Sequence, residues 1–243
     1  MKNLNLDLCI TLRCNNYCLN CIKFCNKDKT TGLDYSDSDM TMEQINNFIN
    51  QVKTLDTKNL FTSITVTGGE PLLHPDIKEI MIKLEELKKL SYVKILWINS
   101  NKIIKAPESL KKYIVNYSEV DKKPQIHNVA LLHPSDFNGK TMAYKTCKHY
   151  RKKTIVLTYM GYSICCAADG YIRLFGMKDL ISDKLPTYKL IKKMDKICKH
   201  CPFGNDDILP FEKDIGCPVS DIYKKEAEKN RLGRKITKRF GVK

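Results

Sequence analysis

The sequence predicts an α/β fold, a partial β/α barrel followed by a small α+β extension. Segments with strand character alternate with amphipathic helices over the first hundred residues, which is typical of parallel βα units. The cysteine pattern changes at Cys147, before a complete eight-stranded barrel of about 200 residues would end. The segment after it contains a hairpin pattern and clustered cysteines. We therefore expect a barrel at residues 1–140, an extension at 141–220 and a basic tail at 221–243.

The composition narrows the range of functional classes to which the chain can belong. The chain has 243 residues, 11 cysteines and a formal net charge of +15. It has no secretion signal and no apolar run near the ~18 residues of a membrane helix, so we expect a cytoplasmic protein without membrane contact. Cysteines at this number, in a long chain without a signal, favour metal binding over disulfides. The positive charge fits solvated lysines and leaves nucleic acid open as a partner.

The first expected strand, residues 4–12, alternates leucine or isoleucine with smaller or polar residues. Its apolar face should pack against helices, as in a β/α barrel. Asp7, Cys9 and Thr11 fall on the other face. We expect these three side chains to point inward, toward whatever the next loop binds.

That loop contains Cys14, Cys18 and Cys21 in the spacing C-x3-C-x2-C. Thiolates are soft ligands suited to iron–sulfur clusters and zinc. Three of them this close can hold one face of a cubane cluster and leave a fourth iron open to a substrate or cofactor. The loop comes at the C-terminal end of a strand, where such barrels place their chemistry. A zinc site is the alternative.

Two more βα units come next in the chain. A capping box begins an amphipathic helix over residues 41–55, and a strand rich in β-branched residues covers 60–67. A second amphipathic helix begins near Pro75. The apolar run 93–98 predicts a strand that is buried on both faces.

Both of these strands end in small or polar residues. Gly68, Gly69 and Glu70 come after the second strand, and glycines there permit close approach of the backbone to a ligand. Asn99 and Ser100 come after the third strand. A plain turn is the alternative at both places.

The cysteine loop, together with the run Thr-Gly-Gly-Glu-Pro-Leu-Leu-His-Pro-Asp at residues 67–76, resembles the motifs of the radical S-adenosylmethionine (SAM) enzymes. The resemblance implies that Cys14, Cys18 and Cys21 bind a 4Fe-4S cluster whose open iron chelates SAM. It also implies an external electron donor such as flavodoxin or ferredoxin. Cleavage of SAM would give a 5′-deoxyadenosyl radical that abstracts a hydrogen from the substrate.

The same resemblance assigns the cofactor contacts. Gly68, Gly69 and Glu70 match the motif that contacts the methionine amino group of SAM, and Asn99 and Ser100 match residues that contact its ribose or carboxylate. The family often has an aromatic residue just before the third cysteine, where this chain has Asn20. The contact to the adenine therefore lacks its usual side chain.

Two further strands are expected at residues 113–118 and 126–132. His133 comes directly after the second of them and is a candidate catalytic residue, as a proton carrier that lines the pocket. A structural or surface histidine is the alternative.

A second cysteine set accompanies an expected hairpin, residues 154–158 with 162–167, and a helical run at 188–197. This part resembles the auxiliary-cluster extension of radical SAM enzymes, the twitch domain, a short relative of the SPASM domain. The resemblance implies a second, auxiliary 4Fe-4S cluster. Its ligands would be Cys147, Cys166 (from a G-x4-C motif), Cys198 and Cys201. Three alternatives stay open: Cys165 or Cys217 replaces a ligand, or the site holds zinc.

An auxiliary cluster suggests an electron acceptor, and hence a net oxidation of the substrate. The triad begins fourteen residues into the chain, which we take to leave no room for a leader-peptide-binding domain. We therefore expect a small-molecule or nucleotide-derived substrate. The alternatives are a peptide (RiPP) maturase, an enzyme acting on a nucleic-acid-linked group, and a non-catalytic iron–sulfur or zinc module.

Overall fold

The computed structural model describes residues 2–16, 18, 21–25, 38–115, 132–137, 147, 154–185, 193–201 and 219–232. Its elements in chain order are β1 (Leu4–Thr11), α1 (Met42–Leu55), β2 (Phe61–Gly68), η1 (Pro71–Leu73), α2 (Ile77–Lys89), β3 (Val93–Ile98), α3 (Glu108–Lys111), η2 (Pro134–Phe137), β4 (Thr154–Thr158), β5 (Gly161–Ile164), α5 (Cys166–Leu174), η3 (Lys178–Leu180), α7 (Asp195–Cys198) and α8 (Asp221–Leu232).

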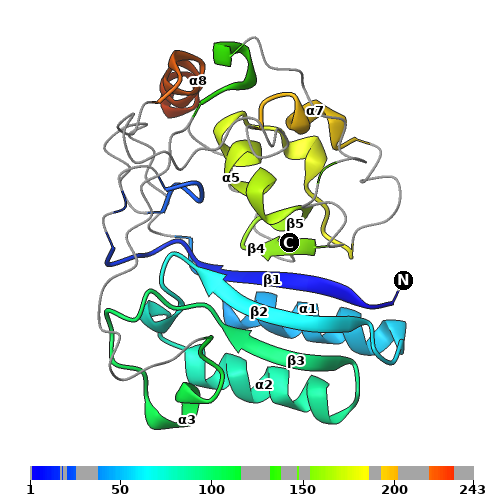
Figure 1. Cartoon of the computed structure of the whole chain (residues 1–243). Helices are drawn as coiled ribbons and strands as arrows, with labels where there is room; N and C mark the ends of the chain where they lie inside the picture. The colour runs from blue at the N-terminus through cyan, green and yellow to red at the C-terminus, as the bar shows by residue number, and fades with distance from the viewer. Residues whose placement is uncertain are drawn as a thin grey trace.

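One five-stranded sheet organises the molecule, in the order β3-β2-β1-β4-β5. The first four of these strands are parallel, and β5 pairs antiparallel with β4. Helices α1 and α2 connect β1, β2 and β3 and lie on the same face of the sheet (Figure 1). The predicted α/β fold with an open, partial barrel is confirmed.

Local sequence explains why α1 begins where it does. The Thr41 hydroxyl accepts a hydrogen bond from Gln44 N at 3.2 Å, and the Gln44 side chain accepts one from Thr41 N at 3.0 Å. This is the predicted capping box, which satisfies two backbone donors that the helix leaves free. The Gln44 amide also donates to Tyr159 O at 3.0 Å, and so fixes α1 to the β4–β5 turn.

The two faces of β1 differ as predicted. Leu6 and Leu8 are fully buried in the main core. Asp7 lies on the opposite face, in a row with Thr65 of β2 and Val156 of β4. Cys9 follows on the same face and is buried; a register shift separates it from Thr11, which is buried too. The inward-pointing face is therefore polar near the centre of the sheet.

The prediction that β3 is buried on both faces is wrong. Ile95 and Trp97 are each 39 % exposed, while Leu96 and Ile98 are buried. The reason is position, because β3 is the outer strand of the sheet. Beyond it, among the described residues, lies only an isolated bridge between Ile98 and Ile114. Ile114 belongs to the strand expected at 113–118. Residues 116–118 of that strand lie outside the described residues, as does most of the strand expected at 126–132.

The predicted hairpin is confirmed as β4 and β5, but it is shorter than expected. Strand β5 ends at Ile164, and α5 begins at Cys166. The hairpin also extends the N-terminal sheet, because β4 pairs directly with β1. The helix expected at 188–197 is described only from residue 193, and α7 begins there at Asp195. Part of the expected basic tail forms α8. Residues 186–192 and 233–243 lie outside the described residues.

A second apolar core forms around α5. It joins Phe24, from the end of the cysteine loop, to Tyr171 of α5, Ile197 of α7 and Tyr223 of α8. Residues far apart in the sequence therefore pack together above the sheet in the view of Figure 1. Within the described chain, no helix has both the length and the apolar character needed to cross a membrane.

Candidate functional site

The carboxyl ends of β1, β2 and β3 meet at one edge of the sheet, because these strands are adjacent and parallel. Backbone hydrogen bonds join the segments that leave these three strand ends. Gly69 N donates to Thr11 O at 2.9 Å, Glu70 N donates to Arg13 O at 2.8 Å, and Asn99 N donates to Val66 O at 2.9 Å. The structure thus brings together the cysteine loop, the Gly-Gly-Glu turn and the polar residues after β3. We call this region the strand-end site.

The two glycines are required by the close approach of the chain to itself. A Cβ atom on Gly68 would lie 2.2 Å from Thr11 O. A Cβ atom on Gly69 would lie 2.2 Å from Arg13 O and 2.8 Å from the Cβ of Cys14. Any side chain there would displace the start of the cysteine loop. The predicted contact of these glycines with SAM stays a prediction.

Glu70 links the ends of β2 and β3. Its carboxylate is fully buried and accepts hydrogen bonds from Leu72 N at 3.0 Å and Asn101 N at 2.7 Å. Burial raises the pKa of this carboxyl, and the bonds from Asn101, Leu72 and the Ser100 side chain oppose that shift. The carboxylate therefore organises the strand-end site from within.

Asn101 is a site residue that sequence reasoning missed. Its side-chain amide donates to Asn15 Oδ1 at 2.8 Å and contacts Cys14 Sγ at 3.8 Å. Ser100 is buried and Asn99 is exposed. Asn101 continues the polar run that made Asn99 and Ser100 candidates, and this was the available signal.

Arg13 and Asp39 were also missed. They form an ion pair at 2.6 Å, and Arg13 Nη2 donates to Leu73 O at 2.7 Å. Thr11 Oγ1 hydrogen-bonds to Asp39 and accepts from Arg13 N. These contacts fix the stem of the cysteine loop on both sides. Asp39 lies too far along the chain for local spacing to reveal the pair.

Cys14, Cys18 and Cys21 are all partly buried. Burial raises the pKa of Cys14, and negative charge on Cys21 and Cys18 adds to the shift, so the three thiols lie close enough to influence one another. A hydrogen bond from Cys25 is the main cause that lowers the pKa of Cys21 to about 6. Asn20 lies outside the described residues.

The donor chemistry of this loop fits an iron–sulfur cluster. The loop offers three partly exposed thiols, and Asn16 N and the Asn101 amide lie within hydrogen-bonding reach of Cys14 Sγ. Across the described part of the chain, no three His, Cys, Asp or Glu side chains are already arranged at metal-binding distances. The sulfurs would have to draw closer around a bound cluster.

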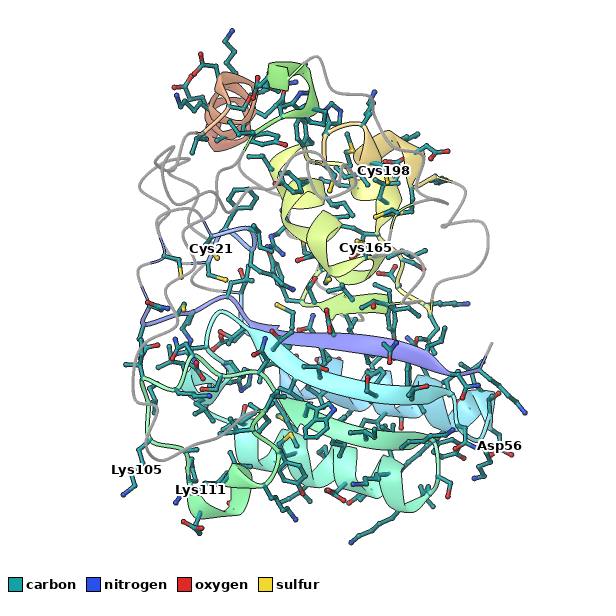
Figure 2. All side chains as sticks on the ribbon, in the orientation of Figure 1. Cys21, Asp56, Lys105, Lys111, Cys165 and Cys198 are labelled. Carbon is teal, nitrogen blue, oxygen red and sulfur yellow. The ribbon has the colours of Figure 1, made fainter. Side chains whose placement is uncertain are left out.

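The structure separates the two adjacent thiols of the second cysteine set. Cys166 packs against the main core, and it hydrogen-bonds to Asp7 on the inner face of β1. Cys165 packs against the second core, as do Cys198 and Cys201. Figure 2 shows Cys165 and Cys198 in the same part of the molecule, away from Cys21.

Cys147 lies near Cys198. Burial raises the pKa of Cys198 to about 12, and Cys147 is the next cause of that shift. Cys165 has an unusual backbone, with φ of 83° immediately before α5. A non-glycine residue with positive φ is costly unless its surroundings impose it. Cys217 lies outside the described residues.

His133 lies beside the second cysteine set and contacts its C-x2-C turn. Its Nε2 is 2.9 Å from Nδ1 of His200, the residue before Cys201, and its Nδ1 is 2.6 Å from Ser135 Oγ. Its ring also packs edge-on against Tyr223. Burial lowers the pKa of both histidines, that of His200 to about 4. A catalytic role for His133 stays a prediction.

Comparison with known proteins gives structural likeness only. No family model matches the chain, and no curated protein matches it. Streptococcus suis SuiB bound to precursor peptide SuiA aligns at 23 % identity with a TM-score of 0.33, covering 46 % of this chain and 23 % of SuiB. BtrN in complex with AdoMet and 2-DOIA aligns at 15 % identity with a TM-score of 0.43, covering 87 % of this chain and 99 % of BtrN.

Both are radical SAM enzymes. This is the superfamily that the motifs of the sequence resemble. At these identities and TM-scores the alignments assign neither a fold nor an activity to this chain. This chain spans about a quarter of the length of SuiB.

Proposed function

We propose that this protein is a radical SAM enzyme. The observation that carries the proposal is the strand-end site, where three motifs separated in sequence are joined by hydrogen bonds. Gly69 and Glu70 bond to the stem of the cysteine loop, and Asn101 bonds to both Glu70 and the loop. A chance zinc-binding loop after β1 would not require the other two segments to converge on it.

In this proposal Cys14, Cys18 and Cys21 hold a 4Fe-4S cluster and the backbone at Gly68–Gly69 faces SAM. When bound, the cluster would supply the electron for the cleavage of SAM. The chain's own residues position that group. Asn101 places a donor beside Cys14 Sγ, and hydrogen bonds to ligand sulfurs tune the reduction potential of such clusters.

The second cysteine set would hold an auxiliary cluster. We assign its ligands as Cys147, Cys165, Cys198 and Cys201, with Cys165 in place of Cys166. Three observations support the substitution: Cys165 packs on the same core as the C-x2-C pair, Cys166 is engaged with Asp7, and α5 begins between the two thiols. A cluster there supplies an electron acceptor for a net oxidation of the substrate.

The substrate would lie against the inner face of the sheet. Asp7, Thr65 and Trp97 share one row of that face, which combines a carboxylate, a hydroxyl and an aromatic ring. Such a surface offers both hydrogen bonds and an apolar wall to a small polar molecule. We therefore favour a small-molecule or nucleotide-derived substrate.

The test is anaerobic reconstitution of the full chain with iron and sulfide, before SAM and a reductant are added. The proposal expects about eight irons per chain, as two cubane clusters require, and release of 5′-deoxyadenosine. A cluster-loaded protein that releases none would overturn it and favour a binding module. About four irons with cleavage would retain the enzyme and remove the auxiliary cluster.

Substrate class can be tested with deuterium-labelled candidates. Abstraction transfers the label into 5′-deoxyadenosine, which mass spectrometry detects. Transfer from a small alcohol or a nucleoside would support the proposed class. Transfer from a peptide alone would replace it with peptide maturation.

A further inference from the structure

Helix α5 lies unusually close to the backbone just after Cys21. A Cβ atom on Gly170 would lie 2.0 Å from Ile22 O and 3.1 Å from two ring atoms of Phe24. A carbon and an oxygen in contact normally keep about 3.3 Å between them. Only glycine permits this approach, and any larger residue would push the helix and the loop apart.

A buried arginine holds the same contact from the next turn of the helix. Arg173 forms a salt bridge with Asp169 through Nη1 and donates to Lys23 O through Nη2. The side chains of Arg173 and Asp169 are at most 2 % exposed. The planar guanidinium can bond a carboxylate and a carbonyl at once, which a lysine ammonium does with much poorer geometry.

The two residues after Ile22 make further contacts with α5. Lys23 Nζ is buried, and the negative charges of Asp169 and Asp7 act on it. Phe24 packs edge-on against Tyr171 with ring centroids 6.1 Å apart. The segment 22–24 is therefore held against one helix by close backbone contact, by the hydrogen bond from Arg173 to Lys23 O and by ring packing.

The other end of α5 belongs to the second cysteine set. The helix begins directly after Cys165, and it packs against α7, which contains Cys198, and against α8. Cys165 is labelled at the start of α5 in Figure 2, where Cys21 is seen across the molecule. One nine-residue helix thus connects the two regions that carry cysteines.

We propose that α5 positions Cys21, and that Gly170, Asp169 and Arg173 are positioning residues for the SAM-binding cluster. They fix the backbone at residues 22–24, directly after the third cysteine, without being ligands themselves. The geometry of the first cysteine site then depends on the helix that starts at the second. The inference rests on the proposed function and adds to it a physical dependence between its two sites.

The experiment uses the full chain, reconstituted and reduced, with EPR spectra recorded before and after SAM is added. The change that SAM induces belongs to the cluster that binds it, so the second cluster does not obscure the comparison. The test variants are Gly170→Ala and Arg173→Lys. Leu180→Ala is the matched control, because Leu180 is a fully buried member of the same second core and lies outside α5.

We expect Gly170→Ala to shift the EPR signal of the first cluster and to weaken SAM binding at least tenfold. Arg173→Lys should produce a smaller change in the same direction, and it remains informative if the alanine variant does not fold. Leu180→Ala should lower the melting temperature and leave both the signal and the SAM response as in the wild type.

Two results would overturn the inference: wild-type spectra and SAM affinity in both α5 variants, or an equal change in the Leu180 control. A wild-type protein that binds iron but shows no response to SAM would instead overturn the proposed function. The role of α5 would then be decided by comparing the iron content and visible absorption of the first site between the Gly170→Ala and Leu180→Ala variants.

Discussion

The strand-end site and the second cysteine region are built in different ways. The first is joined largely through the backbone, with Gly69, Glu70 and Asn101 donating main-chain N–H groups across strand ends. The second depends on side chains, such as the ring of His200 stacked on Phe175 and the ring of Tyr171 packed against that of Tyr223. The strand-end site should therefore be sensitive to changes in backbone geometry, whereas the second cysteine region should be sensitive to replacement of individual side chains.

The largest effect that separates the two regions concerns their cysteines. Cys18→Ala should abolish SAM cleavage, a loss beyond the roughly 100-fold typical of supporting residues around a metal. Cys198→Ala should leave cleavage intact and stop product formation, because only the second site is broken. Chromatography of 5′-deoxyadenosine and of product distinguishes the two. Full turnover by the Cys198 variant would show that the second set is not the electron acceptor.

The next largest effect should be on the free energy of unfolding, when the backbone contacts of the strand-end site are disturbed. Gly69→Ala places a methyl group against Arg13 O and Cys14, and overpacking of this kind should cost about 3 kcal/mol. Denaturant unfolding of the full chain measures it. Lys88→Ala, at an exposed position of α2, should change stability by less than about 0.5 kcal/mol. Equal stability of the two variants would mean that the strand ends are not held together.

The third test is Glu70→Gln, which should change how the stability of the chain depends on pH. The amide group would meet a backbone donor where the carboxylate accepted one, at a cost of about 1–3 kcal/mol. In the wild type the raised pKa of Glu70 means that the folded chain binds its proton more tightly than the unfolded chain. The contribution of Glu70 to the free energy of unfolding therefore falls as the pH rises from the ordinary pKa of 4.5 through the raised pKa of the folded chain. Unfolding curves at several pH values should show this slope in the wild type and lose it in the variant.

The smallest effect should come from Tyr223→Phe. The hydroxyl donates to His200 O at 2.6 Å and also lies 3.3 Å from Leu132 O, and losing this hydrogen bonding should cost about 1 kcal/mol. The change removes no ring contact with His133, so the second core should stay packed. Thermal unfolding gives the cost, and SAM cleavage serves as the control because it should not change. A loss of cleavage would mean that the Tyr223 hydroxyl also acts on the strand-end site.

The sequence predicted what local patterns determine. The alternation of β1, the capping box at Thr41 and the positions of the motifs at strand ends all depend on residues close together in the chain. The exposure of Trp97 was not predictable from an apolar run, because it depends on which strand lies at the edge. The partners of Arg173 and His133 were equally hidden, since Lys23 and His200 are brought to them only by packing of the whole chain.

The position of β1 has a consequence for folding. It precedes the other four strands of the sheet in the chain, yet it lies in the middle of the sheet, paired on one side with β2 and on the other with β4. The second pairing joins Asn5 to Thr154, so it requires most of the chain to be synthesised first. Contacts of such long range slow folding, and an unpaired central strand is an open template for another chain. Fragments that stop before β4 should therefore aggregate through the free edge of β1, even though they contain the complete strand-end site.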